Sequence, residues 1–140
     1  MVKVMMGVKG TGKTKRLVEL VKQAAEEAQG DIICIEKDRS LTYEIPYSAR
    51  LIFASDYSIG TFEFLKGLIS GLNAGNYDIT HVFIDSLLKL VNKSEYQDIS
   101  QVESFLDWLS DFSQRENINF FITISMDVSM ATPAIRKYFE

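Results

Sequence analysis

Predominantly apolar segments alternate with amphipathic segments of helical spacing along the whole chain, and this alternation leaves few folds available to it. The apolar segments cover residues 2–6, 32–35, 51–54, 79–84 and 119–124. Strands that are apolar on both faces must be covered by helices on both sides. The pattern therefore predicts a three-layer α/β/α fold with a five-stranded, mainly parallel sheet.

The segments between these strands predict helices with definable ends. Apolar residues from 17 to 28 follow helical spacing up to Gly30, which we interpret as a C-cap. A second apolar stripe begins at Leu65 and ends near Gly75. Residues 39–50, around Pro46, show neither the spacing of a helix nor the apolar run of a strand, and we expect them to be irregular.

Two later segments carry signals for the start of a helix. Ser100 and Glu103 have the spacing of a capping box ahead of an apolar stripe that begins at Phe105. Thr132 followed by Pro133 is typical of an N-cap and first helical position. We therefore expect one long helix from about residue 100 and one short helix near the end of the sequence.

Composition limits the function classes. The 140 residues include 15 Lys and Arg against 19 Asp and Glu, for a formal charge of −4, without a repeat or linker, so we expect one domain over residues 1–140. No apolar run approaches the ~20 residues of a membrane span, which favours a cytoplasmic protein. The acidic balance argues against a dedicated nucleic-acid binder. One cysteine, Cys34, which is expected to be buried, and one histidine, His81, cannot form the usual zinc site.

A glycine-rich motif stands between the first predicted strand and the first predicted helix. It fits G-x-x-x-x-G-K-[ST] at every fixed position and reads Gly7-Val8-Lys9-Gly10-Thr11-Gly12-Lys13-Thr14. Glycines allow the backbone to approach a phosphate, and consecutive N–H groups at a helix start bind anions. Lys13 is expected to lie along the β and γ phosphates, and the Thr14 hydroxyl to coordinate Mg²⁺. We assign residues 7–14 together with Lys15 to nucleotide binding, as in a P-loop NTPase fold.

A second motif ends the fourth predicted strand. Residues 81–86 read His-Val-Phe-Ile-Asp-Ser, an apolar strand that ends in the carboxylate of Asp85. An aspartate at this place, the Walker B form, holds Mg²⁺ and its waters opposite the P-loop hydroxyl. Thr14 and Asp85 are therefore the predicted metal residues.

With these two motifs the sequence resembles the RecA-like P-loop ATPases. The resemblance implies an extra strand between the two motifs, matched by residues 51–54, and a P-loop strand placed centrally in the sheet. It also implies a catalytic glutamate at the end of the strand that follows the P-loop helix, a role that falls on Glu36 or Asp38. The polar residue expected at the end of the fifth strand is Thr123 or Ser125.

The function that these residues indicate is binding of ATP or ADP with Mg²⁺, with slow or partner-activated hydrolysis of the γ-phosphate. Lys13 would neutralise developing charge, Thr14 and Asp85 would hold the metal, and Glu36 or Asp38 would position water. An alternative is a nucleotide-gated binding module that hydrolyses poorly. A small-molecule kinase ranks last, because no arginine-rich lid is recognisable.

The resemblance also leaves room for a partner. In an oligomeric ATPase a neighbouring subunit or another protein supplies a positive charge to the phosphates. Four basic residues late in the sequence could serve in this way or be ordinary solvated charges: Lys89, Lys93, Arg136 and Lys137.

Overall fold

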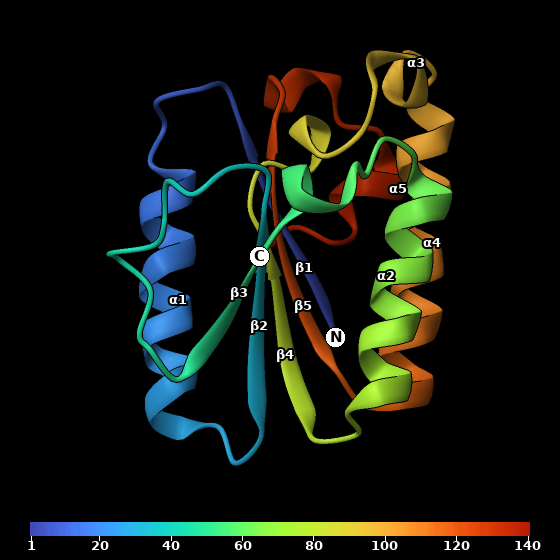
Figure 1. Cartoon of the computed structure of the whole chain (residues 1–140). Coiled ribbons are helices and arrows are strands. Elements are labelled where there is room, and N and C mark those ends of the chain that lie inside the picture. Colours follow the sequence, from blue (N-terminus) through green and yellow to red (C-terminus); the bar gives the residue numbers. More distant parts are fainter.

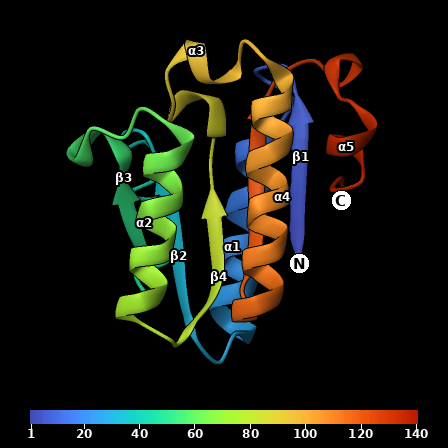
Figure 2. The same ribbon diagram turned by 90° about the vertical axis from the view of Figure 1, so that its right-hand side faces the viewer.

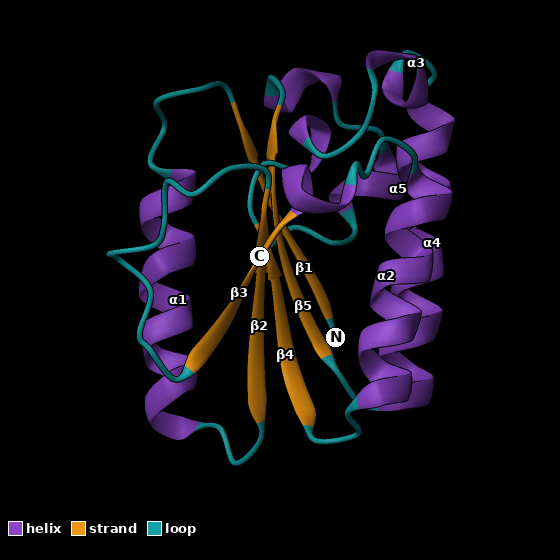
Figure 3. Ribbon diagram, viewed as in Figure 1, coloured by secondary structure: helices purple, strands orange, loops and turns teal.

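The computed structural model describes residues 1–140 and contains one five-stranded sheet (Figures 1 and 3). Every neighbouring pair of strands is parallel, and the order across the sheet is β1-β5-β4-β2-β3. The strands are β1 (Val2–Gly7), β2 (Asp31–Glu36), β3 (Ala49–Phe53), β4 (Ile79–Ile84) and β5 (Asn119–Ser125). The predicted five-stranded sheet is confirmed, and it is parallel throughout.

Helices cover both faces of the sheet. Helix α1 (Lys13–Glu27) lies on one face, and α2 (Phe62–Gly75) and α4 (Ile99–Glu116) lie side by side on the other (Figures 1 and 2). The remaining helical segments are short: η1 (Ala54–Tyr57), η2 (Leu87–Lys89), α3 (Lys93–Tyr96), η3 (Val128–Met130) and α5 (Pro133–Arg136). The 3-10 turns η1, η2 and η3 follow the carboxyl ends of β3, β4 and β5, where the loops gather.

The core is divided by the sheet into two apolar layers. In β4, Val82 and Ile84 face α2 and α4. Phe83 faces α1 and belongs to the same apolar cluster as Leu17 of α1 and Cys34 of β2. Successive side chains of a strand point to opposite faces, so where helices cover both faces, as at Val82–Ile84, consecutive residues of the strand are apolar. Cys34 is buried as expected, and burial next to the charges of Glu36 and Asp85 raises the pKa of its thiol to about 12.

The P-loop strand lies at an edge of the sheet, which contradicts the central place implied by the family resemblance. β1 pairs with β5 on one side only. On its other side there is one isolated bridge, between Val4 and Phe139, in which the Val4 N–H donates to the Tyr138 carbonyl at 2.8 Å. After β5 the chain forms η3 and α5 instead of another strand, because Pro133 starts a helix there.

The predicted capping box at Ser100 and Glu103 is wrong. Helix α4 begins after Asp98, whose carboxylate accepts the Ser100 N–H at 3.0 Å, so Ser100 is already inside the helix. Glu103 accepts the Thr132 hydroxyl at 2.6 Å instead of closing a capping box. Thr132 is the N-cap of α5 as expected, although its hydroxyl bonds Glu103 and not the backbone of its own helix.

Gly30 is not the C-cap of α1, because that helix ends at Glu27 and its C-cap is Ala28. A Cβ atom at position 30 would lie 2.3 Å from the Asp78 carbonyl oxygen. The glycine is required by this close approach of two chain segments at the amino ends of β2 and β4. Gly75 is the last residue of α2, in agreement with the sequence.

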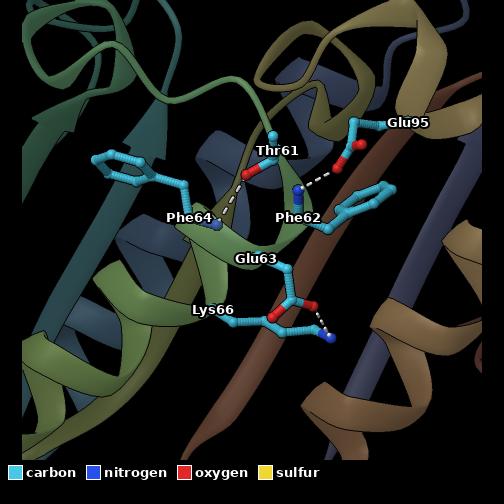
Figure 4. A network of polar contacts seen from close by, with 6 residues as sticks. All are labelled: Thr61, Phe62, Glu63, Phe64, Lys66 and Glu95. Atoms are coloured by element: carbon cyan, nitrogen blue, oxygen red, sulfur yellow. Dashed lines mark hydrogen bonds and ion pairs between the residues drawn. The ribbon is translucent and has the colours of Figure 1, made fainter.

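The start of α2 is held by side chains from two directions (Figure 4). The Thr61 hydroxyl accepts the Phe64 N–H at 3.0 Å, and Glu95 accepts the Phe62 N–H at 2.7 Å from the neighbouring α3. Two of the N–H groups that a helix start leaves without partners are thus satisfied. The buried ring of Phe62 stacks on Phe105 of α4, with ring centroids 4.9 Å apart.

None of the helices combines the length and the apolar character needed to cross a membrane.

Candidate functional site

The glycine-rich motif forms the turn from β1 into α1 at the carboxyl edge of the sheet (Figure 1). Gly10 and Gly12 have φ angles of 88° and 83°, a left-handed conformation that side chains with a Cβ rarely adopt. A Cβ at Gly7 would lie 2.8 Å from the Thr11 Oγ1 atom, which folds back over the turn. The three glycines therefore occupy positions that the turn itself demands.

The N-terminus of α1 differs from those of the other two long helices. Thr61 and Asp98 cap α2 and α4 with side-chain oxygens, whereas the N-cap of α1 is Gly12, which offers none. The first turn of α1 contains no acidic residue and carries Lys13 and Lys15. The helix start therefore keeps free N–H donors and a positive field, which together favour an anion.

The ammonium group of Lys13 lies over the turn. Its Nζ atom is 2.9 Å from the Val8 carbonyl oxygen and 3.4 Å from Thr11 Oγ1. Burial lowers the pKa of Lys13 from its ordinary value, and the negative charge of Asp85 opposes this shift. The Lys13 ammonium is thus placed inside the curl of the motif, near a carboxylate from another strand.

Asp85 is the point at which three chain segments meet. The Thr14 hydroxyl at the start of α1 is 3.2 Å from both carboxylate oxygens of Asp85. Thr123 of β5 donates its hydroxyl to Asp85 at 2.8 Å and accepts the Ser86 N–H at 2.7 Å. The two predicted metal residues are therefore neighbours, and Thr123, one of two candidates for the polar end of the fifth strand, holds Asp85 in place.

The described residues contain no group of three or more His, Cys, Asp or Glu side chains that could hold a metal alone. Thr14 and Asp85 do offer a hydroxyl and a carboxylate within 3.2 Å of each other. Mg²⁺ usually takes one or two protein oxygens and completes its octahedron with water and substrate phosphates. The donor set fits a magnesium ion that arrives with a phosphate ligand.

Two polar cavities adjoin this centre. The first, of about 220 Å³, has no apolar lining residue and is formed by Lys9, Gly10, Gly12, Lys13, Thr14, Lys15, Ser86, Lys89 and Ser125. The second, of about 180 Å³, is also wholly polar and is formed by Glu36, Lys37, Asp38, Ser40, Asp85, Ser86 and Lys89. Ser86 and Lys89 line both, so the cationic cavity and the carboxylate cavity meet at these two residues.

The two candidate catalytic carboxylates differ in their surroundings. Glu36 is only 3% exposed, and its oxygens accept the Ser40 hydroxyl at 2.8 Å and the Ser40 and Leu41 N–H groups at 3.1 Å. Burial raises the pKa of Glu36, against the effect of these hydrogen bonds. Asp38 is exposed and forms no ion pair. Glu36 thus anchors the loop that follows β2, while Asp38 is free in the second cavity.

A third cavity, of about 740 Å³, lies between α1 and the loop after β2 and begins at Thr14 and Lys15. The fully exposed ring of Tyr43 and the side chain of Pro46 belong to its wall. Sequence reasoning did not assign Ser40, Tyr43 or Lys89 to the site. The first two lie in a stretch without periodicity, whereas the sequence left Lys89 either as a charge for a neighbouring subunit's phosphates or as an ordinary solvated charge.

A scan of the sequence against models of known protein families found no match, and a search of curated proteins found no similar sequence.

Proposed function

We propose that this protein binds ATP together with Mg²⁺ at the turn between β1 and α1 and hydrolyses it slowly. The observation that carries the proposal is the contact of Thr14 with Asp85 at 3.2 Å, directly beside an uncapped helix start. Without a ligand this contact joins a hydroxyl to a carboxylate, and both groups are oxygens of the kind that Mg²⁺ selects. Thr14 and Asp85 meet at the edge of the cationic cavity, where they could bind the Mg²⁺ ion that accompanies the nucleotide phosphates.

The cavities suggest how the nucleotide lies. Lys9, Lys13 and Lys15 surround the 220 Å³ cavity and suit a polyphosphate, to which backbone N–H groups of the turn would donate. The larger cavity begins at the same Thr14 and Lys15 and extends toward Tyr43, which leaves room for the sugar and base. We further assign the domain to the RecA-like group, on the motif, on β3 and on the acidic end of β2.

In hydrolysis a water oxygen bonds to the γ-phosphorus as the bond to the bridging oxygen breaks, and ADP, phosphate and a proton are formed. Bound Mg²⁺ would polarise phosphate oxygens as a Lewis acid. Lys13 would offset the charge that develops on the phosphates. Asp38, or Glu36 once its loop contacts loosen, would orient the water and accept its proton.

A second candidate function is a nucleotide-sensing module with little hydrolysis. The hydrogen bonds from Ser40 and Leu41 to Glu36 favour it, because a carboxylate that anchors a loop is less free to orient water. A small-molecule kinase is less well supported, since no arginine lines any of the three cavities.

Calorimetric titration with Mg²⁺-ATP tests the binding proposal. We expect Lys13→Ala to weaken binding by about 10-fold or more, since a charge-assisted contact contributes about 1.5–3 kcal/mol. Asp85→Asn should weaken binding in Mg²⁺ but leave binding in excess EDTA nearly unchanged, because the carboxylate acts on the ion and its waters. Lys93→Ala, in the exposed α3 and outside all three cavities, is the matched control. Equal affinity of wild type and Lys13→Ala would contradict the proposal.

A further inference from the structure

We propose that Lys89 supplies, from within the same chain, the cation that stabilises the terminal phosphate of the bound nucleotide. The inference rests on the proposed nucleotide function and deepens it. Its basis is the position of Lys89 in the wall of both polar cavities, between the lysines of the first and the carboxylates of the second. With the terminal phosphate in the first cavity and the attacking water in the second, the phosphorus–oxygen bond would break at this boundary.

The backbone under Lys89 is firmly placed. Ser86 has a φ of 56°, which turns the chain sharply after Asp85 into η2. The Lys89 N–H donates to the Ser86 carbonyl at 2.9 Å, and Leu87 and Leu90 on either side are 0% and 2% exposed. Two buried leucines therefore fix the turn, while the lysine side chain between them stays exposed at the cavities.

The charge of Lys89 is not used elsewhere in the structure. Arg39 and Lys66, for example, pair with Asp56 and Glu63 at 2.9 and 2.8 Å, whereas Lys89 forms no ion pair. The charged groups around it are Lys9, Lys13 and Lys15 on one side, and Glu36, Asp38 and Asp85 together with Lys37 on the other. An anion in the first cavity would give Lys89 a partner and relieve repulsion among the lysines.

The consequence concerns the source of positive charge. Charge builds on the γ-phosphate oxygens and on the bridging oxygen as the phosphorus–oxygen bond breaks, and a preorganised cation lowers that barrier. The family resemblance named a neighbouring subunit or a protein partner as a possible source of this charge. With Lys89 in its own η2, the chain needs no such donor for basal turnover.

The first test compares affinities for Mg²⁺-ATP and Mg²⁺-ADP by calorimetry. Lys89→Ala should weaken ATP binding by about 10-fold and leave ADP binding within about two-fold, because only ATP carries the phosphate that Lys89 contacts. Lys89→Arg should retain most of the affinity. Lys93→Ala, in the exposed α3 and away from the cavities, should change neither. An equal loss for both nucleotides, or no loss, would overturn the assignment of Lys89.

The second test separates action within the chain from action between chains. Lys89→Ala and Lys13→Ala proteins are mixed, and single-turnover phosphate release is measured. If Lys89 acts on its own site, the mixture shows only the sum of the two low activities. Recovery of activity would mean that Lys89 reaches a neighbour and would overturn the inference. A wild type that binds neither nucleotide would instead overturn the proposed function, and this inference with it.

Discussion

At the scale of single residues, the centre of the site depends on one hydroxyl. Thr123 is 1% exposed and bonds both the carboxylate of Asp85 and the N–H of Ser86. It therefore fixes the side chain that faces the P-loop and the main chain that leads to Lys89. An apolar residue at position 123 could form neither hydrogen bond. The Asp85 carboxylate and the Ser86 N–H would each lose a partner, and a buried polar group without a partner costs free energy.

The roles of the two acidic residues after β2 can be separated by turnover. If Asp38 orients the attacking water, Asp38→Asn should keep nucleotide binding and lose about 10²–10⁴-fold in rate. Glu36→Gln should then have a smaller effect, through the loop that it anchors. Single-turnover phosphate release measures both. The sensing module predicts a wild-type rate near background and no further loss in either variant.

Glu36 should also give the free energy of unfolding a pH dependence. Its folded-state pKa is raised by burial, so its stabilising contribution is full below the unfolded pKa and is lost as pH rises through the folded value. The difference in unfolding free energy, wild type minus Glu36→Gln, should therefore fall as the pH rises above the ordinary glutamate pKa of about 4. Urea denaturation at several pH values checks this. A difference that increases with pH would show that the hydrogen bonds outweigh burial.

At the scale of elements, every predicted strand lies within two residues of an observed one, because strands covered on both faces leave an uninterrupted apolar record. Helix starts were harder. Ser100 and Glu103 match a capping box, yet Asp98, two residues before Ser100, accepts the Ser100 N–H that Glu103 would have to accept. β1 lies at the edge because it pairs only with β5, which is more than 100 residues away in the sequence. A local sequence pattern does not indicate which distant strands pair.

The start of α2 offers a direct measure of capping. Thr61→Ala should lower the free energy of unfolding by about 1 kcal/mol, because the Phe64 N–H loses its acceptor. Thr61→Ser keeps the hydroxyl and should lose much less. Chemical denaturation of the three proteins checks the order. If Thr61→Ala were as stable as wild type, the contact of Glu95 with Phe62 would suffice to hold this helix start.

At the scale of the whole molecule, the site is assembled from β1, α1, β4, η2 and β5, which come from both ends of the sequence. The residues of the glycine-rich motif could be predicted from the sequence, because the single turn between β1 and α1 requires them. The contacts between Thr14 and Asp85, and the shared cavities at Lys89, arise only when the sheet forms. Ligand binding should therefore stabilise the entire domain.

Thermal unfolding tests this coupling. At a nucleotide concentration about 100 times the Kd, mass action adds about 2.7 kcal/mol to the folded state. For a chain of 140 residues this corresponds to a rise in Tm of roughly 8 °C. A 10-fold weaker Kd would halve this stabilisation, so Lys13→Ala should show at most about half the rise in Tm at the same concentration of Mg²⁺-ATP. The same rise in both proteins would place the nucleotide outside the P-loop.

Because Cys34 is buried, the reactivity of its thiol can report the unfolding of the protein. It is the single cysteine of the chain, it is 2% exposed, and its pKa of about 12 keeps it a thiol at neutral pH. The thiolate is the nucleophile that attacks an alkylating reagent and displaces its leaving group, so the folded molecule should resist labelling and the opened molecule should react. The rate of alkylation under native conditions then measures how often the layer between α1 and the sheet opens.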